Sequence, residues 1–140
     1  MNHTATPTAI VPASRTKTVG PFSPGVSIGP LLQVAGQVGV APTAPDASAP
    51  APVASVRTQT LQALDNVREV LTEGRTDWED VLMIRVYLTD TSHLEEFNDT
   101  YREYFSGHGC ETLPARTTVY VGLPAGLLVE IDALAVHGDH

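Results

Sequence analysis

Two charged residues near the C-terminus lie in segments that otherwise read as strands of a buried sheet. The stretch from Leu113 to Val136 reads LPARTTVYVGLPAGLLVEIDALAV, with Arg116 at the head of one such segment and Glu130 inside another. A charge in a buried strand costs free energy unless another group compensates it. A guanidinium can hold a carboxylate through two parallel hydrogen bonds, and a carboxylate can orient a water molecule or accept its proton. Arg116 and Glu130 are therefore the first candidates for chemistry.

Both residues also have a structural interpretation. Arg116 could form an internal ion pair with Glu130 or with Asp132, which shares a strand face with Glu130. Glu130 could be a glutamate exposed to solvent or placed at an interface. Spacing in the sequence does not separate these interpretations from a ligand-binding role.

The elements that must position these residues can be predicted from periodicity. Alternating or continuous short apolar runs predict strands, and apolar residues three or four apart predict helices. The predicted strands are Leu31–Val40, Val81–Leu88, Thr117–Val121 and Leu128–Val136, and the predicted helices are Ser55–Thr72 and Ser92–Gly107. One mixed sheet with two helices on a single face accommodates this order, so we expect an α+β fold.

Local signals indicate where elements and the folded region end. The S-x-x-E pattern of Ser92 and Glu95 predicts a capping box, and Gly74 predicts the end of the first helix. Residues 1–14, rich in Thr, Ala and Pro, are expected to form a flexible tail. Residues 15–137 are expected to form a single domain, with a short tail at 138–140.

The last predicted strand is largely apolar on both faces, one of which also carries Glu130 and Asp132. Positions 129, 131, 133 and 135 are all apolar, and so are the alternate positions 128, 134 and 136. The two helices can cover one face only. A second copy of the chain is expected to cover the other face, so the sequence predicts a homo-oligomer.

Composition argues against several classes of function. The chain has 140 residues and a formal net charge of −8, which opposes binding to nucleic acids and anionic membranes. The sequence shows no apolar run long enough to span a bilayer and no signal-peptide pattern, so a cytoplasmic protein is expected. The single cysteine, Cys110, lies in a polar loop and is a poor candidate nucleophile. The five histidines show no ligand-like spacing, so no metal site is expected.

Five segments of the chain form an ordered set of motifs: GPFSPG, GQVGV, FNDTYREYF, PARTTV and LVEIDALAV. Together they resemble the RidA/YjgF family of reactive-intermediate enamine/imine deaminases, also described as the endoribonuclease L-PSP type. The likeness runs from about residue 17 to residue 136, which is nearly all of the expected domain.

The resemblance implies a chorismate-mutase-like α+β fold that assembles into a homotrimer, with an inner barrel of sheets and three clefts between subunits. It implies cofactor-free hydrolysis of small 2-imino and 2-enamino acids to 2-keto acids and ammonia in those clefts. The implied partners are a small carboxylate substrate and further copies of the chain, with no nucleic acid and no membrane.

Site residues can be carried over from the family by motif. Arg116 in PART matches the arginine that holds the substrate carboxylate, and Glu130 matches the glutamate that positions the attacking water. Asn98 in FNDTY matches a cleft asparagine, and Gly36 in VAGQV matches a glycine whose backbone lines the cleft. The resemblance thus implies that Arg116 and Glu130 are the catalytic pair.

Two positions depart from the deaminase pattern. Phe22 stands where many members have tyrosine, and Thr118 stands where the best-known deaminases have cysteine. Both are expected to contact the substrate, Phe22 as part of the pocket wall. The departures leave open two alternatives, namely non-catalytic binding of a carboxylate metabolite and a biosynthetic enzyme that uses the cleft on a larger substrate. The endoribonuclease activity also attached to this family is opposed by the charge of −8.

Overall fold

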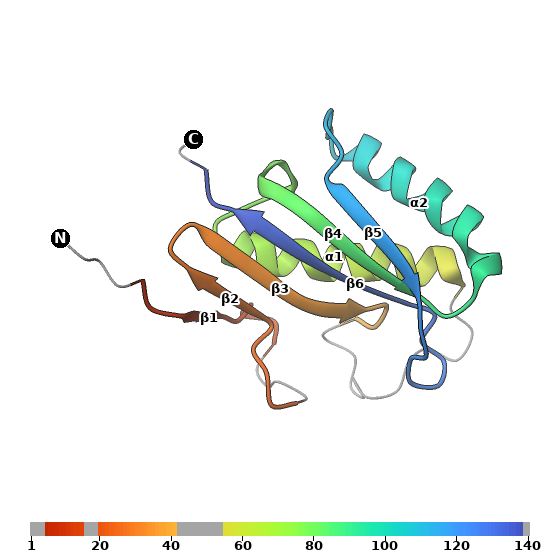
Figure 1. Cartoon of the computed structure of the whole chain (residues 1–140), viewed down its shortest axis with the longest axis horizontal. Helices are drawn as coiled ribbons and strands as arrows, with labels where there is room; N and C mark the ends of the chain where they lie inside the picture. The colour runs from red at the N-terminus through yellow and green to blue at the C-terminus, as the bar shows by residue number, and fades with distance from the viewer. Residues whose placement is uncertain (1–4, 16–19, 42–54, 139–140) are drawn as a thin grey trace.

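The described part of the chain forms one six-stranded sheet and two α-helices (Figure 1). The structure is a computed structural model that describes residues 5–15, 20–41 and 55–138. The helices are α1 (Val56–Glu73) and α2 (Leu94–Gly107). The strands are β1 (Thr8–Ile10), β2 (Gly25–Ile28), β3 (Leu31–Val38), β4 (Val81–Leu88), β5 (Ala115–Tyr120) and β6 (Val129–Val136). The predicted α+β fold is confirmed.

The strand order β1-β2-β3-β6-β4-β5 makes the sheet mixed. Strand β6 pairs antiparallel with both β3 and β4, whereas β4 and β5 run parallel. Parallel neighbours need a long crossover connection, which α2 supplies between β4 and β5. This topology leaves β5, the strand that carries Arg116, at one edge of the sheet with α2 beside it.

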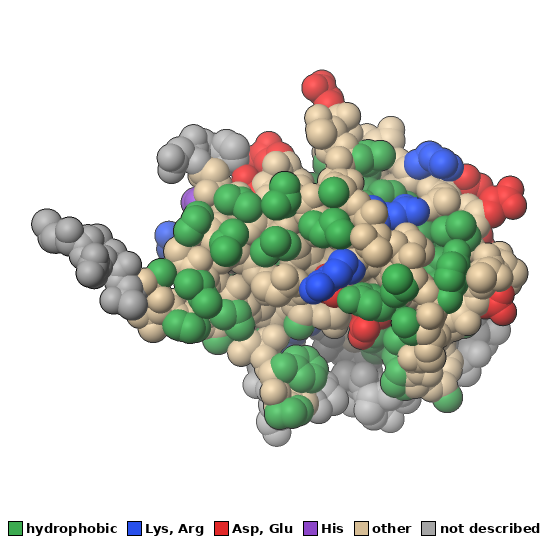
Figure 2. Space-filling model, viewed as in Figure 1, with side chains coloured by type: hydrophobic (Ala, Val, Ile, Leu, Met, Phe, Trp, Pro, Cys, Tyr) green, Lys and Arg blue, Asp and Glu red, His purple; other side chains and the backbone are tan. Residues whose placement is uncertain are grey.

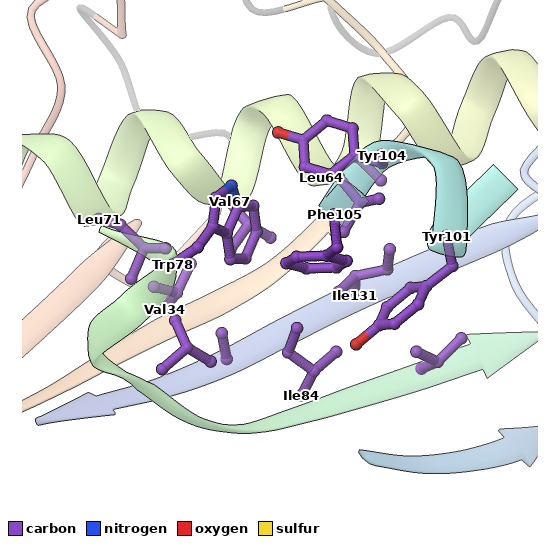
Figure 3. Packing of buried hydrophobic residues seen from close by; sticks show 14 of the residues in the cluster. Val34, Leu64, Val67, Leu71, Trp78, Ile84, Tyr101, Tyr104, Phe105 and Ile131 are labelled. Carbon is purple, nitrogen blue, oxygen red and sulfur yellow. The ribbon is translucent and has the colours of Figure 1, made fainter. Parts of the chain in front are cut away.

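One face of the sheet packs against the helices and forms the hydrophobic core (Figure 3). Positions 129, 131, 133 and 135 of β6 are all buried, as their alternation predicted. The aromatic residues of α2 enter the same core, with Phe97 and Phe105 fully buried and Tyr101 and Tyr104 nearly so. Trp78 packs edge-on against Phe105, with ring centroids 4.8 Å apart. Burial of these rings fixes α2 against the sheet.

The helix ends agree with the sequence prediction at α1 but not at α2. The Ser55 hydroxyl accepts a hydrogen bond from the Thr58 N–H and caps α1, which ends at Gly74. At α2 the predicted capping box of Ser92 and Glu95 is wrong. Asp90 instead accepts from the Ser92 N–H at 2.8 Å and caps a short 3-10 turn, and α2 then begins at Leu94 without a side-chain cap. The Ser92 N–H, which a capping box would donate to Glu95, is thereby already bonded to Asp90.

The N-terminal segment departs from the prediction of a tail over residues 1–14. Thr8–Ile10 form β1, which pairs antiparallel with Gly25–Ser27 of β2. Backbone pairing needs no apolar periodicity, so the sequence pattern of this short strand gave no signal. Residues 41–54, which are rich in Pro and Ala, are expected from their composition to form a loop. Of these residues the structure describes Ala41 alone.

The second face of the sheet is not covered by the described chain (Figure 2). Leu31, Val119 and Val136 on this face are 47%, 40% and 37% exposed. Between them, Arg85 and Asp132 form an ion pair with 2.8 Å between Nε and Oδ1. Hydrophobic side chains therefore surround a compensated charge pair on an open surface, which is a composition suited to an interface.

The end of β3 is fastened to α1 by the amide of Asn66. The Asn66 side chain is buried, and its Nδ2 donates to the carbonyls of Val38 and Val40, each at 2.9 Å. Its Oδ1 accepts from Gln62 at 2.9 Å. Both N–H donors and the oxygen of this amide are thereby hydrogen-bonded, and the path of the chain after β3 is fixed.

Replacing Asn66 with alanine is expected to lower the free energy of unfolding by about 1–3 kcal/mol, because two partly buried carbonyls each lose the hydrogen bond that Asn66 donates. Urea denaturation followed by circular dichroism measures this loss. Gln62→Ala is the matched control, since it removes only the bond to Asn66, and it should cost less than about 1 kcal/mol. Equal losses in the two variants would contradict the role given to the carbonyl contacts.

Candidate functional site

Arg116 lies on the edge strand β5 with its side chain on the helix side of the sheet. The residue opposite Arg116 on the neighbouring strand β4 is Ile84, a fully buried core residue. The Nη2 of Arg116 donates to Oδ1 of Asn98 at 2.7 Å. Its Cζ lies 5.3 Å from the ring centroid of Phe97 and 4.8 Å from that of Tyr101. Helix α2 therefore holds the guanidinium by one hydrogen bond and two aromatic faces.

The internal ion pair considered for Arg116 is not formed. Asp132 accepts instead from Nε of Arg85 at 2.8 Å and from the hydroxyl of Tyr87 at 3.0 Å. In the strand register, Glu130 of β6 lies opposite Tyr87 of β4. Tyr87 is three residues after Ile84, which lies opposite Arg116. An odd separation along a strand places two side chains on opposite faces. Within one chain, Arg116 and Glu130 therefore face opposite sides of the sheet.

The guanidinium keeps donors that the described chain does not use. A guanidinium has five N–H groups, and the hydrogen bond that the described residues provide to Arg116 is the one to Asn98. Thr118 follows two residues later on the same face of β5, and its hydroxyl is buried without a partner among the described residues. Buried polar groups nearly always have hydrogen-bond partners, so the space beside the Arg116 guanidinium and the Thr118 hydroxyl suits a polar ligand.

Tyr101 lies beside Arg116 as well. The apolar period of residues 92–107 indicates only that Tyr101 is on the inner face of the helix. Its ring lies against the Arg116 guanidinium, and its hydroxyl is buried without a partner in the described part of the chain. Burial raises the pKa of Tyr101 to about 12, although the Arg116 charge opposes this rise. Asn98 and Tyr101 are three residues apart and so share a helix face. This spacing is the sequence signal that could have placed Tyr101 beside Asn98 in the site. Apolar periodicity alone does not distinguish a core ring from the wall of a site.

Gly36 and Glu130 lie against each other on neighbouring strands. The register between β3 and β6 shifts between Val34 and Gln37, which places an irregularity at Gly36. A Cβ at position 36 would lie 2.8 Å from Cδ of Glu130 and 3.0 Å from its Oε1. A glycine is therefore needed where the carboxyl group of Glu130 lies.

Phe22 is an exposed residue in the segment that leads to β2. It lies in the bend before β2, and its side chain is 58% exposed. The carbonyl of Pro24 accepts from the Ala35 N–H at 2.8 Å, which ties the bend to β3 one residue before Gly36. An exposed aromatic ring is available to contact a ligand or another copy of the chain.

The Glu130 carboxyl has a perturbed acidity. Burial raises the pKa of Glu130, and the negative charge of Asp132 raises it further. Among the residues that the structure describes, no hydrogen bond or ion pair to Glu130 offsets this effect. A carboxyl group whose pKa is moved toward neutrality is better matched to proton transfer than an ordinary glutamate.

The predicted site residues therefore divide into two half-sites. The guanidinium half-site consists of Asn98, Arg116 and Thr118, with Phe97 and Tyr101 beneath the guanidinium. The carboxyl half-site consists of Gly36 and Glu130. Phe22 lies in the bend before β2, which the Pro24 carbonyl ties to β3. The fold brings the members of each half-site together, but one chain does not bring Arg116 to Glu130.

Two surface hollows lie apart from the half-sites. One is lined in part by Asp77, Trp78, His108 and Cys110, and the other by polar residues of α1, α2 and the turn before α2. Within residues 5–15, 20–41 and 55–138, no group of three or more His, Cys, Asp or Glu is arranged to hold a metal ion. Neither described helix is both long enough and apolar enough to cross a membrane.

Comparison with known proteins gives consistent relatives. The family model described as endoribonuclease L-PSP matches residues 12–137. A RutC family protein of Saccharolobus solfataricus is 36% identical over 120 residues, covering 85% of this chain and 89% of the relative. The 2-iminobutanoate/2-iminopropanoate deaminase of Mus musculus is 35% identical over 121 residues, covering 86% and 84%. The structure of the YjgF gene product from E. coli superposes with a TM-score of 0.83 at 30% identity, covering 94% of this chain and 99% of that one.

Replacing Glu130 with glutamine is expected to leave the midpoint of thermal unfolding at pH 7 unchanged or higher. Its folded-state pKa is raised, so the stability it contributes is present below its unfolded pKa and is lost as pH rises through the folded pKa. Asp132→Asn is the contrasting variant, because it breaks the ion pair with Arg85 and should lower the midpoint. Thermal melts of both variants between about pH 4 and about pH 8 test this expectation, because carboxyl groups titrate within that interval. A midpoint for Glu130→Gln well below wild type at pH 7 would contradict the uncompensated burial of this carboxyl.

Proposed function

Because the chain belongs to the RidA/YjgF proteins of the endoribonuclease L-PSP family, we propose that it hydrolyses small 2-imino and 2-enamino acids to 2-keto acids and ammonia. One observation carries the proposal. The Arg116 guanidinium is fixed by Asn98 and two aromatic rings while no carboxylate of the described chain neutralises it. A positioned, unneutralised guanidinium is suited to a substrate carboxylate. The relatives named as iminobutanoate/iminopropanoate deaminases indicate the substrate class.

The proposed reaction needs an anchor, a placed water molecule and proton transfer. Arg116 binds the substrate carboxylate through two N–H groups. Glu130 accepts a proton from water as the water oxygen bonds to the imine carbon, and the C=N electron pair moves to nitrogen, which takes up a proton. In the resulting carbinolamine the amino nitrogen takes up a proton and leaves as ammonia when the C–N bond breaks, while the O–H proton is removed and the C=O bond forms. The net change is imino acid plus water to keto acid plus ammonia, with no cofactor required.

We further propose that a complete site forms between two copies of the chain in a homotrimer. The two half-sites lie on opposite faces of one sheet, and a second copy can bring its carboxyl half-site to the guanidinium half-site of the first. The open sheet face, with exposed Leu31, Val119 and Val136, provides the apolar surface that such an assembly would bury. The family resemblance supports three copies rather than two.

A binding protein without turnover is the second candidate. Its support is the completeness of the guanidinium half-site within one chain, since Asn98 and the aromatic rings hold Arg116 without any help from Glu130. The departures at Phe22 and Thr118 also leave room for an enzyme that acts on a larger substrate in the same cleft. The net charge of −8 opposes an RNA substrate.

Arg116→Ala is expected to abolish acceleration of imine hydrolysis. A dehydratase acting on threonine generates 2-iminobutanoate, semicarbazide traps the remaining imine, and the rate of imine loss is measured with and without the protein. Loss of a charge-assisted, two-point contact should weaken binding of 2-oxobutanoate by about 1.5–3 kcal/mol, or roughly 10- to 150-fold. If wild-type protein binds 2-oxobutanoate but leaves the imine lifetime unchanged, the binding protein is the better description.

Two inactive variants are expected to restore activity when they assemble together. Arg116→Ala and Glu130→Gln each lack one half-site, but a mixed oligomer contains junctions where an intact Arg116 meets an intact Glu130. Random assembly at equal amounts should return about a quarter of wild-type activity. The variants are unfolded together and refolded as a mixture, with each variant refolded alone as the control. A mixture as inactive as its components would place both residues of a working site in one chain.

The acid limb of the pH–rate profile is expected to lie above pH 4.5, the pKa of an ordinary glutamate. Burial and the Asp132 charge raise the pKa of Glu130, and the proposed base must be deprotonated, so activity falls as pH drops through that raised pKa. Rates of imine hydrolysis corrected for the uncatalysed reaction, measured across the acid range, locate the limb. A limb at or below the ordinary value would exclude Glu130 as the titrating base.

A further inference from the structure

The rings of Phe97 and Tyr101 form an aromatic shelf beneath the Arg116 guanidinium. Their centroids are 5.6 Å apart with an interplanar angle of 39°, and Arg116 Cζ lies within 5.3 Å of both. The closer contact, at 4.8 Å, is with Tyr101. The distance is within the range in which a cation is attracted by the electron-rich ring face.

The shelf is anchored in the core and is not a mobile surface feature. Phe97 is fully buried, and Tyr101 is 3% exposed. Tyr101 packs on Phe105 with centroids 4.7 Å apart, and Phe105 packs on Trp78 at 4.8 Å. In Figure 3 the labelled rings of Tyr101 and Phe105 lie between α2 and the strands. A ring held on several sides offers a fixed plane to the side chain above it.

We propose that Tyr101 is a positioning residue, whose ring face orients the Arg116 guanidinium so that its free N–H groups meet a substrate carboxylate together. This inference rests on the proposed function and assigns the orientation of the anchor to the ring, not to the phenol hydroxyl. Asn98 fixes one nitrogen and the shelf fixes the plane, and two such constraints define the direction of the remaining donors.

The physical benefit is preorganisation. A free arginine side chain loses rotamer entropy when it closes on a ligand, and a side chain already fixed by the protein loses less. The phenol of Tyr101 is neutral near pH 7, as any tyrosine is, and burial raises its pKa further, to about 12, so Tyr101 does not neutralise Arg116 as a phenolate would. The guanidinium thus stays both oriented and positively charged.

The test compares three rings at position 101: tyrosine, phenylalanine and 3,4,5-trifluorophenylalanine. Fluorine withdraws electrons from the ring face with little change of shape, so it weakens attraction for a cation without opening a cavity. Tyr101→Phe should keep wild-type affinity for 2-oxobutanoate, whereas the fluorinated ring should weaken it by on the order of tenfold. KM for the imine should rise in parallel while kcat changes by less than about twofold. Equal affinity for the phenyl and fluorinated rings, or loss in Tyr101→Phe, would overturn the inference.

Phe105→Leu is the matched control for a merely structural role. Phe105 is buried in the same stack, and among the described residues its ring contacts those of Trp78, Tyr101 and Tyr104. Truncation there should lower the thermal midpoint but leave the affinity for 2-oxobutanoate within about twofold of wild type. An equal loss of affinity in Phe105→Leu and in the fluorinated protein would show that core packing, and not the ring face, sets the anchor.

A measurement without ligand separates this inference from the proposed function. Rotation of the Arg116 guanidinium about its Nε–Cζ bond, followed by nitrogen-15 NMR of the unliganded protein, should be slow with tyrosine or phenylalanine at position 101 and faster with the fluorinated ring. If the protein binds no keto acid while this difference is seen, the proposed function fails and the positioning by Tyr101 stands. If rotation is the same with all three rings, the positioning role fails even when the enzyme is active.

Discussion

The contact between the Arg116 guanidinium and helix α2 is the interaction on which the candidate site depends. The parallel pairing of β4 with β5 requires a crossover, and that crossover is α2, which therefore lies beside the edge strand. One turn of α2 presents Phe97, Asn98 and Tyr101 to the same side chain. The topology thus supplies both the charge and its support. A guanidinium held in this way has a defined direction without a neutralising carboxylate.

The pleat of the sheet explains why a single chain holds only the two separate half-sites. Side chains alternate across a strand, and the register places Arg116 on the helix side and Glu130 on the open side. No rotamer change carries either group through a closed sheet. The separation also agrees with the raised pKa of Glu130, which burial and the charge of Asp132 cause, while Arg116 lies on the other face. A second copy is the direct way to unite the groups.

Assembly with further copies of the chain would both cover the open sheet face and complete the candidate site. Leu31, Val119 and Val136 remain exposed because both helices lie on the other face. The ion pair of Arg85 and Asp132 lies among these apolar side chains with its charges already compensated, so covering it would leave neither ion unpaired. An assembly that buries this face would remove apolar surface from water and bring half-sites of different copies together. Stability and function would then favour the same oligomer.

The sequence by itself determined the α+β fold, because strand and helix periods are local properties that its apolar residues display clearly from β3 to β6. It also singled out the charged residues, since Arg116 and Glu130 interrupt apolar strands. Only the tertiary structure decided that these two residues face opposite sides of the sheet, that Tyr101 supports the arginine, and that β1 joins the sheet. The reason is that register, helix placement and edge pairing are set by contacts between segments distant in the chain, and no local pattern records them.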